Sequence, residues 1–274
     1  MSPIEGYIEK MTKVEQREQL VLELLQNFQR LDIKQVAQWM DISETTARRM
    51  CTKLEEDRKV IRVHGGVQLA NQLPQNYSFE LRETKDLYEK VAIGKYGASL
   101  IESGDRIFCD SGTTIHQFVL SLINRIKKKE LYDVVLLTNS LANFNPIANF
   151  CKVILLGGEV RLPRMDVCGT IAESTLRKFH ITKAFLGVDA IDMAKGFMTT
   201  DERTAQMNEI VINDAERSFV LADSSKFDKN SFISYANCRQ ITEVVTDWNI
   251  IKTVTKAYEE TGFSLKVLDE PKYR

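Results

Sequence analysis

The sequence predicts an α/β chain in two parts: a small N-terminal unit of helices closed by a β-hairpin, and a larger unit built on an open, mostly parallel sheet flanked by helices. Helical periodicity runs through residues 14–57, and an alternating stretch with a glycine pair follows it. From residue 106, seven short apolar runs alternate with helix-like stretches, which is the pattern of a parallel sheet with crossover helices.

Composition narrows the function classes. The chain has 274 residues, more than a typical domain of roughly 100 to 200, and its 43% hydrophobic and 27% charged content is that of a soluble globular protein. A net charge of -1 gives no general attraction to nucleic acid or anionic membranes, so any DNA binding must be local. No apolar run approaches the roughly 20 residues of a membrane span, and the start lacks a secretion signal. We therefore expect a cytoplasmic protein without a membrane partner.

Five cysteines and three histidines are scattered along the chain. The cysteines form no C-x-x-C pair, and their odd number argues against a disulfide framework. The histidines do not cluster. We expect reduced, mostly buried thiols, and neither a metal site nor a cofactor.

The N-terminal unit is predicted element by element. Amphipathic helices are expected over residues 14–28, 33–40 and 44–57, with Ser43 as the N-cap of the third, and a hairpin over 60–69. On a helical wheel the third helix has an apolar and a polar face. The apolar face consists of Ala47, Met50, Cys51 and Leu54, and the polar face carries Thr45, Arg48, Arg49 and Thr52.

This order of elements is that of a winged helix-turn-helix, whose third helix enters the DNA major groove. Arginine suits that task because its guanidinium can donate two hydrogen bonds to a guanine or a phosphate. A helical dimerisation module with solvated arginines is the alternative, but the hairpin, with Arg62 and His64 beside its tip, favours DNA binding. Residues 1–70 hold eleven basic and eleven acidic residues, so affinity would depend on charge concentrated at the contact surface and doubled by dimerisation.

A polar stretch with one proline separates the two units. It predicts a linker at residues 71–79, between an N-terminal domain at 1–70 and a C-terminal domain at 80–274. A single long helix is expected over residues 78–105, closing at Ser103 and Gly104.

The motif FCDSGTT, residues 108–114, predicts an anion-binding turn. A strand that ends at Asp110 and turns through Ser111 and Gly112 into a helix would aim unpaired backbone N–H groups at one point. Gly112 permits close approach of the main chain, and the hydroxyls of Thr113 and Thr114 add donors. The alternative is an ordinary capped turn, which is common in α/β proteins.

Polar residues end most of the apolar runs, and in a parallel sheet such ends can meet in one crevice. The residues concerned are Asp110, Asn139, Gly157, Gly158, Asp189 and Asp223, with Ser140 and Lys226 in the adjoining turns. Alternatively these residue types only terminate strands, which we prefer for Asp247 and Asp269. Lys226 and Arg161 would then be ordinary surface cations.

The chain resembles the DeoR family of bacterial transcriptional regulators over about residues 14–247. The matching motifs are, in order, ISETTARRMCTKLEEDRKVIRVHGGV, DSGTT, LTNS, LLGGEVR, AFLGVDAID and LADSSKFD. The resemblance implies a winged helix-turn-helix followed by a sensor domain similar to ribose phosphate isomerases and related sugar-phosphate-binding folds. It also implies that a phosphorylated sugar or a related metabolite changes the affinity of the protein for its operator.

The resemblance implies roles for particular residues. The candidate contacts to double-stranded operator DNA are Ser43, Thr45, Thr46, Arg48, Arg49, Lys53, Arg62 and His64. The candidate contacts to a phosphorylated sugar effector are Asp110, Ser111, Gly112, Thr113, Thr114, Asn139, Ser140, Gly157, Gly158, Asp189 and Lys226. Family members usually carry a glutamate and a basic residue where this chain has Thr204 and Asn208, which implies an altered effector pocket or oligomer contact.

Three functions are open at this point. The leading one is a transcriptional regulator without catalytic residues, expected to be a homodimer or homotetramer that represses a carbohydrate-utilisation operon. The second is a sugar-phosphate isomerase or deaminase with an N-terminal appendage, for which Asp110, Asp189 or Asp223 would be the general base. The third is a constitutive regulator whose pocket has lost its ligand.

Overall fold

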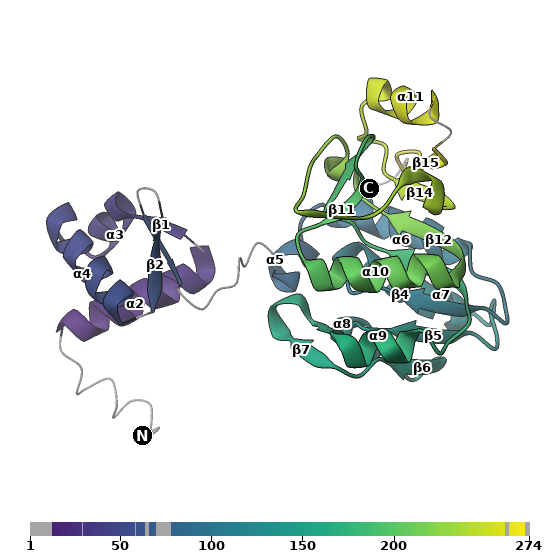
Figure 1. The fold of residues 1–274 in the computed structure, drawn as a ribbon, viewed down its shortest axis with the longest axis horizontal. Helices are drawn as coiled ribbons and strands as arrows, with labels where there is room; N and C mark the ends of the chain where they lie inside the picture. The colour runs from purple at the N-terminus through teal and green to yellow at the C-terminus, as the bar shows by residue number, and fades with distance from the viewer. Residues whose placement is uncertain are drawn as a thin grey trace. The chain divides into compact units, whose positions relative to one another are not determined.

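The computed structural model divides into two compact units, Met1–Asn76 and Tyr77–Arg274 (Figure 1). The structure describes residues 13–28, 30–57, 59–63, 66–69, 78–260 and 263–271. Of the expected linker, residues 71–77 lie outside these ranges, and Phe79 is already the first residue of a helix.

The N-terminal unit combines helices with a small antiparallel sheet. Its described elements are α2 (Lys13–Phe28), β1 (Arg30–Asp32), α3 (Ile33–Trp39), α4 (Glu44–Glu56), β2 (Val60–Val63) and β3 (Gly66–Leu69). The three expected helices and the hairpin are confirmed. β3 also pairs with β1, a strand too short for its alternation to be recognised in the sequence. Gly66 permits this pairing, because a Cβ there would collide with the carbonyl of Leu31 in β1.

Helix α4 has the two faces that its sequence predicts. The Ser43 hydroxyl accepts a hydrogen bond from the backbone N–H of Thr46 at 3.2 Å, so the predicted N-cap is confirmed. The apolar face is buried in the core of the unit and consists of Ala47, Met50, Cys51 and Leu54. Arg48 and Arg49 are exposed. The polar face therefore stays accessible to a partner.

The C-terminal unit is built on a seven-stranded parallel sheet in the described part of the chain. The strands are β4 (Arg106–Cys109), β5 (Val135–Thr138), β6 (Lys152–Leu155), β9 (Ile181–Leu186), β12 (Ala215–Leu221), β14 (Glu243–Thr246) and β15 (Leu265–Val267). Each comes from one of the seven apolar runs, so the predicted open parallel sheet is confirmed. The strand order is β15-β14-β12-β9-β4-β5-β6, which places β9 and β4 near the centre.

Helices cover both faces of the sheet (Figure 1). Three of them contribute to the hydrophobic core on one face: α6 (Leu87–Ser99), α7 (Thr113–Lys127) and α8 (Leu141–Ile147). The core on the other face includes α9 (Thr170–Leu176), α10 (Glu202–Asp214) and α11 (Lys252–Glu260). Phe118 of α7 stacks on Phe185 of β9 with 4.3 Å between ring centroids, and Phe185 stacks on Phe219 of β12 at 5.1 Å. These rings hold α7 over the centre of the sheet.

The single helix expected over residues 78–105 is wrong. Two helices, α5 (Phe79–Glu83) and α6, are separated by a turn in which Asp86 has a φ of 50°. A continuous right-handed helix excludes that conformation. The buried Nζ of Lys90 donates hydrogen bonds to the carbonyl oxygens of Arg82 at 2.5 Å and Lys85 at 2.6 Å. Two hydrogen bonds from one side chain thus stabilise the break, and helical periodicity does not reveal them.

Short segments add two further antiparallel sheets. β7 (Glu159–Arg161) pairs with β8 (Asp166–Cys168), and the 3₁₀ helix η1 (Leu162–Arg164) joins them. β11 (Gly196–Thr199) pairs with both β10 (Ala190–Asp192) and β13 (Ile233–Ala236). Two further 3₁₀ helices, η2 (Ser224–Lys226) and η3 (Cys238–Gln240), follow β12 and β13. These segments are short and mix apolar with polar residues, so most of them lack the apolar runs by which the strands of the parallel sheet stand out in the sequence.

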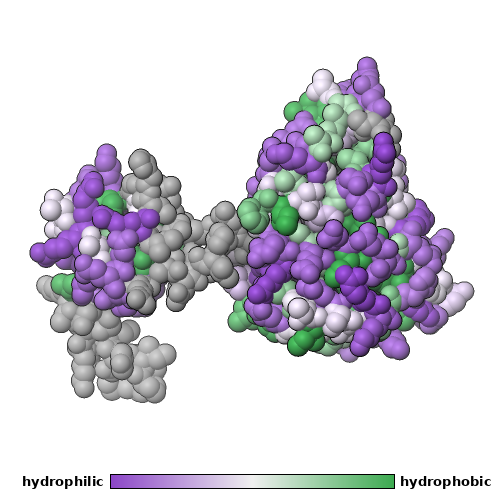
Figure 2. All heavy atoms as spheres, viewed as in Figure 1, coloured by the Kyte–Doolittle hydropathy of each residue, from purple (hydrophilic) through white to green (hydrophobic). Residues whose placement is uncertain are grey.

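Hydrophilic residues dominate the face of the C-terminal unit that is visible in Figure 2, with small hydrophobic patches between them. Among the described residues, no helix combines the length and the apolar character needed to cross a bilayer.

Helices α6 and α7 approach each other closely through glycine. A Cβ on Gly94 would lie 2.5 Å from the backbone carbon of Gln117 and 2.5 Å from the backbone nitrogen of Phe118 in α7. Glycine lowers helix stability by about 1 kcal/mol relative to alanine, so Gly94 favours packing over helix propensity. This packing helps to fix α7, whose amino end is part of the pocket described below.

We expect Gly94→Ala to lower the free energy of unfolding of the C-terminal unit by about 1–3 kcal/mol, because backbone atoms of α7 cannot yield to the added methyl group. Gly157→Ala is the matched control, because a Cβ at Gly157 meets nothing within 4 Å. The change from glycine to alanine lowers the conformational entropy of the unfolded chain equally in both variants. Urea unfolding of both variants measures the difference. Equal stability of the two variants would show that α6 and α7 can separate without cost.

Candidate functional sites

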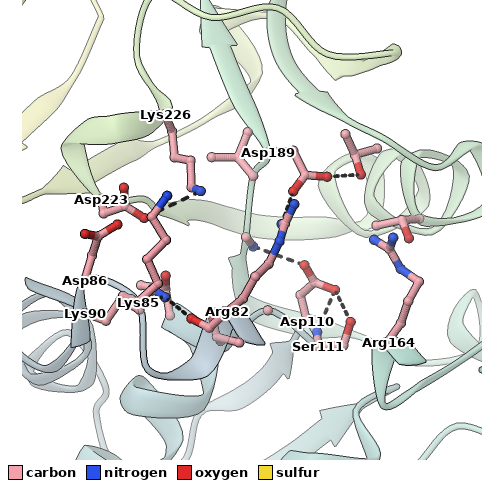
Figure 3. A pocket seen from close by; sticks show the side chains of 17 residues that line it. Arg82, Lys85, Asp86, Lys90, Asp110, Ser111, Arg164, Asp189, Asp223 and Lys226 are labelled. Atoms are coloured by element: carbon pink, nitrogen blue, oxygen red, sulfur yellow. Dashed lines mark hydrogen bonds and ion pairs between the residues drawn. The ribbon is translucent and has the colours of Figure 1, made fainter. Parts of the chain in front are cut away.

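A pocket opens beside the carboxyl ends of β4, β9 and β12 (Figure 3). Its cavity volume is about 150 Å³. The predicted effector contacts that line it are Asp110, Ser111, Gly112, Thr113, Thr114, Asp189 and Lys226, and Asp223 lies with them. The lining residues that sequence reasoning did not name as contacts are Arg82, Lys85, Asp86, Lys90, Arg164, Gly187, Val188, Thr199 and Thr204. The pocket thus brings together part of the set of strand-end residues that the sequence predicted, with additional cations along its walls.

The loop between β4 and α7 forms one wall of the pocket. Gly112 is the N-cap of α7 and its carbonyl accepts the first helical hydrogen bond, from His116 at 2.9 Å. The first turn of α7 therefore presents backbone N–H groups at the cavity, where the helix dipole favours an anion. Thr113 and Thr114 line the same wall with their hydroxyl-bearing side chains.

Asp110 holds this loop in place. One carboxylate oxygen accepts from the backbone N–H of Ser111 at 2.7 Å, and the other accepts from the N–H of Gly187, after β9, at 3.1 Å. Burial raises the pKa of Asp110 above its ordinary value, although these two N–H groups counteract it in part. Asp110 therefore ties the loop to the turn after β9. The backbone N–H groups of the first turn of α7, which Asp110 does not bind, are better placed than Asp110 to meet an anion.

Asp189 and Arg82 form an ion pair across the pocket, with 2.6 Å between their nearest atoms (Figure 3). The other oxygen of Asp189 accepts three hydrogen bonds of 3.0 Å, from the Thr199 hydroxyl and from the N–H and hydroxyl of Thr200. Burial raises the pKa of Asp189, but Arg82 and the Thr200 N–H outweigh burial, so the pKa lies below its ordinary value. Asp189 is a fixed, charged anchor for Arg82.

Asp223 and Lys226 lie at the two ends of η2, and both line the pocket. One oxygen of Asp223 accepts from the backbone N–H of Ser225 at 3.1 Å, whereas the other is buried, without a hydrogen-bond partner among the described residues. That second oxygen is 3.8 Å from the Nζ of Lys226. Asp247 accepts from the N–H of Ser224 at 2.7 Å, so it positions η2, a structural role like the one that we preferred for it from the sequence.

Lys90 adds a buried cation to the pocket. Burial lowers the pKa of its ammonium group, and the nearby Asp223 counteracts that effect in part. Nothing in the sequence indicated that Lys90 and Arg82 would line the pocket. Their positions there depend on the break between α5 and α6, which the sequence did not reveal.

Asn139, Ser140, Gly157 and Gly158 do not line the pocket. The ribbon of β7 and β8 occupies the carboxyl ends of their strands: the N–H of Val167 donates to the carbonyl of Asn139 at 2.8 Å. Ser140 instead caps α8 by accepting from the N–H of Asn143 at 3.1 Å. These residues stay outside the pocket because the β7–β8 ribbon is inserted at the ends of their strands. The expectation that the ends of parallel strands meet in one crevice does not take such an insertion into account.

Arg161 belongs to an ion network behind the pocket wall. Its guanidinium donates two hydrogen bonds of 2.8 Å to Asp166, one of 2.6 Å to Asp201 and one of 3.1 Å to the hydroxyl of Thr204. Burial opposes the ionisation of Asp201, but Arg161 and the N–H of Thr204 prevail and lower its pKa to about 2. The departure noted at Thr204 thus supplies a small hydroxyl that links this network to the cavity.

The predicted DNA contacts on α4 differ in their ion-pair and hydrogen-bond partners. Thr45, Thr46, Arg48 and Arg49 are exposed along one side of the helix. Arg48 lies 3.7 Å from Glu44, an exposed pair one turn away, and Arg49 has no ion-pair partner among the described residues. Ser43 is engaged as the N-cap. Arg48 and Arg49 are therefore both accessible cations of this helix.

The remaining predicted DNA contacts differ in their surroundings. The Nζ of Lys53 lies 2.8 Å from the buried carboxylate of Glu18 in α2, so its charge is already compensated. Arg62 in β2 is 4.0 Å from Glu55, at the limit of an ion pair. His64 lies outside the described residues. Lys53 thus joins two helices of the unit, a role that charge alone did not indicate.

Comparisons with known proteins match both units to family models. A model described as the DeoR-like helix-turn-helix domain matches residues 17–73, and one described as the DeoR C terminal sensor domain matches residues 85–248. The HTH-type transcriptional repressor GlcR of Bacillus subtilis (strain 168) is 32% identical over 93% of this chain and 97% of its own. The lactose phosphotransferase system repressor of Lactococcus lactis subsp. lactis is 31% identical over 83% of this chain and 88% of its own. Ribose 5-phosphate isomerase A of Methanocaldococcus jannaschii aligns with a TM-score of 0.38 and 21% identity over 50% of this chain and 53% of that chain.

Asp110→Ala should lower the free energy of unfolding of the C-terminal unit by about 1–3 kcal/mol, because it leaves the N–H groups of Ser111 and Gly187 without their acceptor. Asp269→Ala, at an exposed position, is the control for loss of a carboxylate. Urea unfolding at pH 7 compares them. A destabilisation no larger than that of the control would mean that Asp110 does not hold the loop.

The Asp201 carboxylate should give a pH-dependent contribution to stability. Its folded pKa of about 2 lies below the unfolded value, so its contribution is present above about pH 4 and is lost as the pH falls towards 2. We expect Asp201→Asn to lower the free energy of unfolding by about 1–3 kcal/mol at pH 7, and by progressively less in acid. Urea unfolding from pH 7 to pH 2.5 tests this, and a constant difference would contradict it.

Proposed function

The chain belongs to the DeoR family of transcriptional regulators, and we propose that it represses a carbohydrate-utilisation operon and that a phosphorylated sugar changes its affinity for operator DNA. The N-terminal unit would bind the operator and the C-terminal unit the effector. Two relatives carry names of repressors, and one of these names refers to a lactose phosphotransferase system, which supports sugar-linked control in this chain.

Helix α4 is the element that we assign to the major groove. Arg48 and Arg49 are exposed on it, next to Thr45 and Thr46, and their guanidinium groups suit base edges and phosphates. The unit as a whole has no excess of positive charge, so a single copy would bind weakly. We therefore propose a homodimer or homotetramer that places two copies of α4 on a two-fold operator.

The observation that carries the effector assignment is the amino end of α7, which lies in a pocket whose walls carry cations. A phosphate group would accept hydrogen bonds from the first turn of α7, with Lys226 as a nearby positive charge. The buried oxygen of Asp223 that lacks a hydrogen-bond partner would accept from a sugar hydroxyl. A phosphorylated sugar combines both groups in one small molecule.

The chain is a regulator and not an isomerase or deaminase with an appended domain, because its family consists of transcriptional regulators. Two of the three candidate carboxylates agree with this. Asp110 accepts from two backbone N–H groups, and Asp189 accepts from Arg82 and two threonines, so both are engaged in structural hydrogen bonds. Asp223 keeps one oxygen without a hydrogen-bond partner among the described residues, and we assign that oxygen to effector binding, so the case against catalysis rests on the family.

The effector would act by linkage. A ligand changes DNA affinity only through its different affinities for two arrangements of the protein, and such coupling is typically about 1–3 kcal/mol. The expected effect on operator affinity is therefore about 5- to 150-fold.

Fluorescence anisotropy with DNA from upstream of the gene itself, at fixed near-physiological salt, tests the proposal. The panel consists of glucose 6-phosphate, fructose 6-phosphate, fructose 1-phosphate and glyceraldehyde 3-phosphate, with the free sugars and inorganic phosphate as controls. One phosphosugar should change the affinity at least several-fold. Competitor-resistant DNA binding that no member of a widened phosphosugar panel alters, with no thermal shift of the protein, would indicate a constitutive regulator instead.

Variants should separate the two activities. Arg49→Ala should weaken operator binding by about 1–3 kcal/mol and leave phosphosugar binding unchanged. Asp223→Asn should weaken phosphosugar binding at least several-fold and leave operator affinity unchanged. Arg177→Ala, at an exposed position of the C-terminal unit, controls for the loss of one positive charge. If either variant abolished both activities in folded protein, the division of roles between the units would be wrong.

A further inference from the structure

The segment of residues 79–90, hereafter the α5–α6 segment, supplies one side of the pocket. Arg82, Lys85, Asp86 and Lys90 all line the cavity, and all lie within this segment. It is also the part of the C-terminal unit that follows the DNA-binding unit in the chain, because β3 ends at Leu69 and α5 begins at Phe79. The pocket wall thus includes the first described helix that follows the DNA-binding unit in the chain.

Helix α5 has little stability of its own. It spans Phe79–Glu83, far fewer than the roughly 12 residues at which isolated helices become marginally stable, so its position depends on tertiary contacts. Two of these contacts are made to α7, where the ring of Phe79 packs edge-on against His116 and the carboxylate of Glu83 lies 3.7 Å from the same imidazole. Packing on α7 places α5 next to the helix whose amino end forms the anion-binding wall.

Further contacts of the α5–α6 segment are electrostatic and lie inside the pocket. Arg82 is bound to Asp189 at 2.6 Å, and the Lys90 ammonium is bound to the carbonyls of Arg82 and Lys85. Asp189 is held by Thr199 and Thr200, so the aspartate end of the ion pair is fixed. If the pair is broken, Arg82 is the partner that moves.

We infer that the Arg82–Asp189 ion pair couples the pocket to the DNA-binding unit: an anionic ligand competes with Asp189 for the Arg82 guanidinium and thereby shifts α5. The inference rests on the proposed function, since it assigns the regulation of the same site. A phosphate accepts the planar guanidinium in a bidentate manner, as a carboxylate does, and it brings up to two negative charges into the cavity. Any displacement of α5 moves the chain end that leads to the DNA-binding unit.

This coupling predicts which ligands act. A phosphorylated sugar competes for Arg82 and changes operator affinity. The corresponding free sugar has no anion for Arg82, so it leaves operator affinity unchanged even when it occupies the pocket. Breaking the ion pair by substitution imitates the ligand, because α5 loses the same contact.

The test uses the full chain with Asp189→Asn, which keeps the side-chain size, and Arg82→Gln, which shortens the side chain; each substitution removes one charge. Without any ligand, both variants should show faster amide hydrogen exchange in peptides from residues 79–86. Their operator affinity should differ from that of the wild type about fivefold or more, in the direction that the active phosphosugar of the panel produces. Saturating phosphosugar should then change the affinity of the variants by less than about twofold. Arg106→Ala, which breaks the Arg106–Asp133 pair outside the pocket, should match the wild type in all measurements.

The ligand-free measurements decide the inference by themselves. If Asp189→Asn and Arg82→Gln fold and bind the operator with wild-type affinity and wild-type exchange in residues 79–86, the inference is refuted. If only the wild-type response to the phosphosugar panel is missing, the proposed effector class is refuted, whereas a changed operator affinity in both variants still supports the ion pair as the element that controls DNA binding.

Discussion

Parallel pairing of the seven strands is the constraint on which the rest of the C-terminal unit depends. Because every strand runs in the same direction, every strand must be followed by a crossover, and all carboxyl ends meet at one edge of the sheet. The loop after β4, the turn after β9 and η2 after β12 are brought together only by this arrangement. The aromatic stack of Phe118, Phe185 and Phe219 then holds α7 over those strands, so that its first turn faces the cavity.

Much of this fold follows from the sequence because its signals are local. The seven apolar runs, the Ser43 cap and the buried face of α4 each depend on residues within a few positions of one another. The loop at residues 110–114 could be recognised for the same reason. The role of Asp110 could not, because it depends on the N–H of Gly187, far away in the chain.

The elements that the sequence did not reveal depend on individual side-chain and backbone contacts that hydrophobic periodicity does not report. The break between α5 and α6 is stabilised by Lys90, a residue that helical periodicity alone would assign to an uninterrupted helix. The expectation that strand ends meet in one crevice placed Asn139 and Gly157 at the pocket, but β8 covers that part of the sheet edge. The pocket also carries its own countercharges, as the pair of Arg82 and Asp189 shows. An anionic ligand in this pocket would therefore compete with the carboxylates of this network for the cations.

The contact between Lys53 and Glu18 has a consequence for the thermodynamics of operator binding. A cation that neutralises a DNA phosphate releases condensed counterions, and each such contact makes the logarithm of the binding constant fall more steeply with the logarithm of salt concentration. Lys53 already has a buried carboxylate as its counterion, so the ammonium gains little from a phosphate and contributes little to that slope. The steepness of the salt dependence should therefore report on Arg48, Arg49 and Arg62, and would underestimate the number of basic side chains that lie near the DNA.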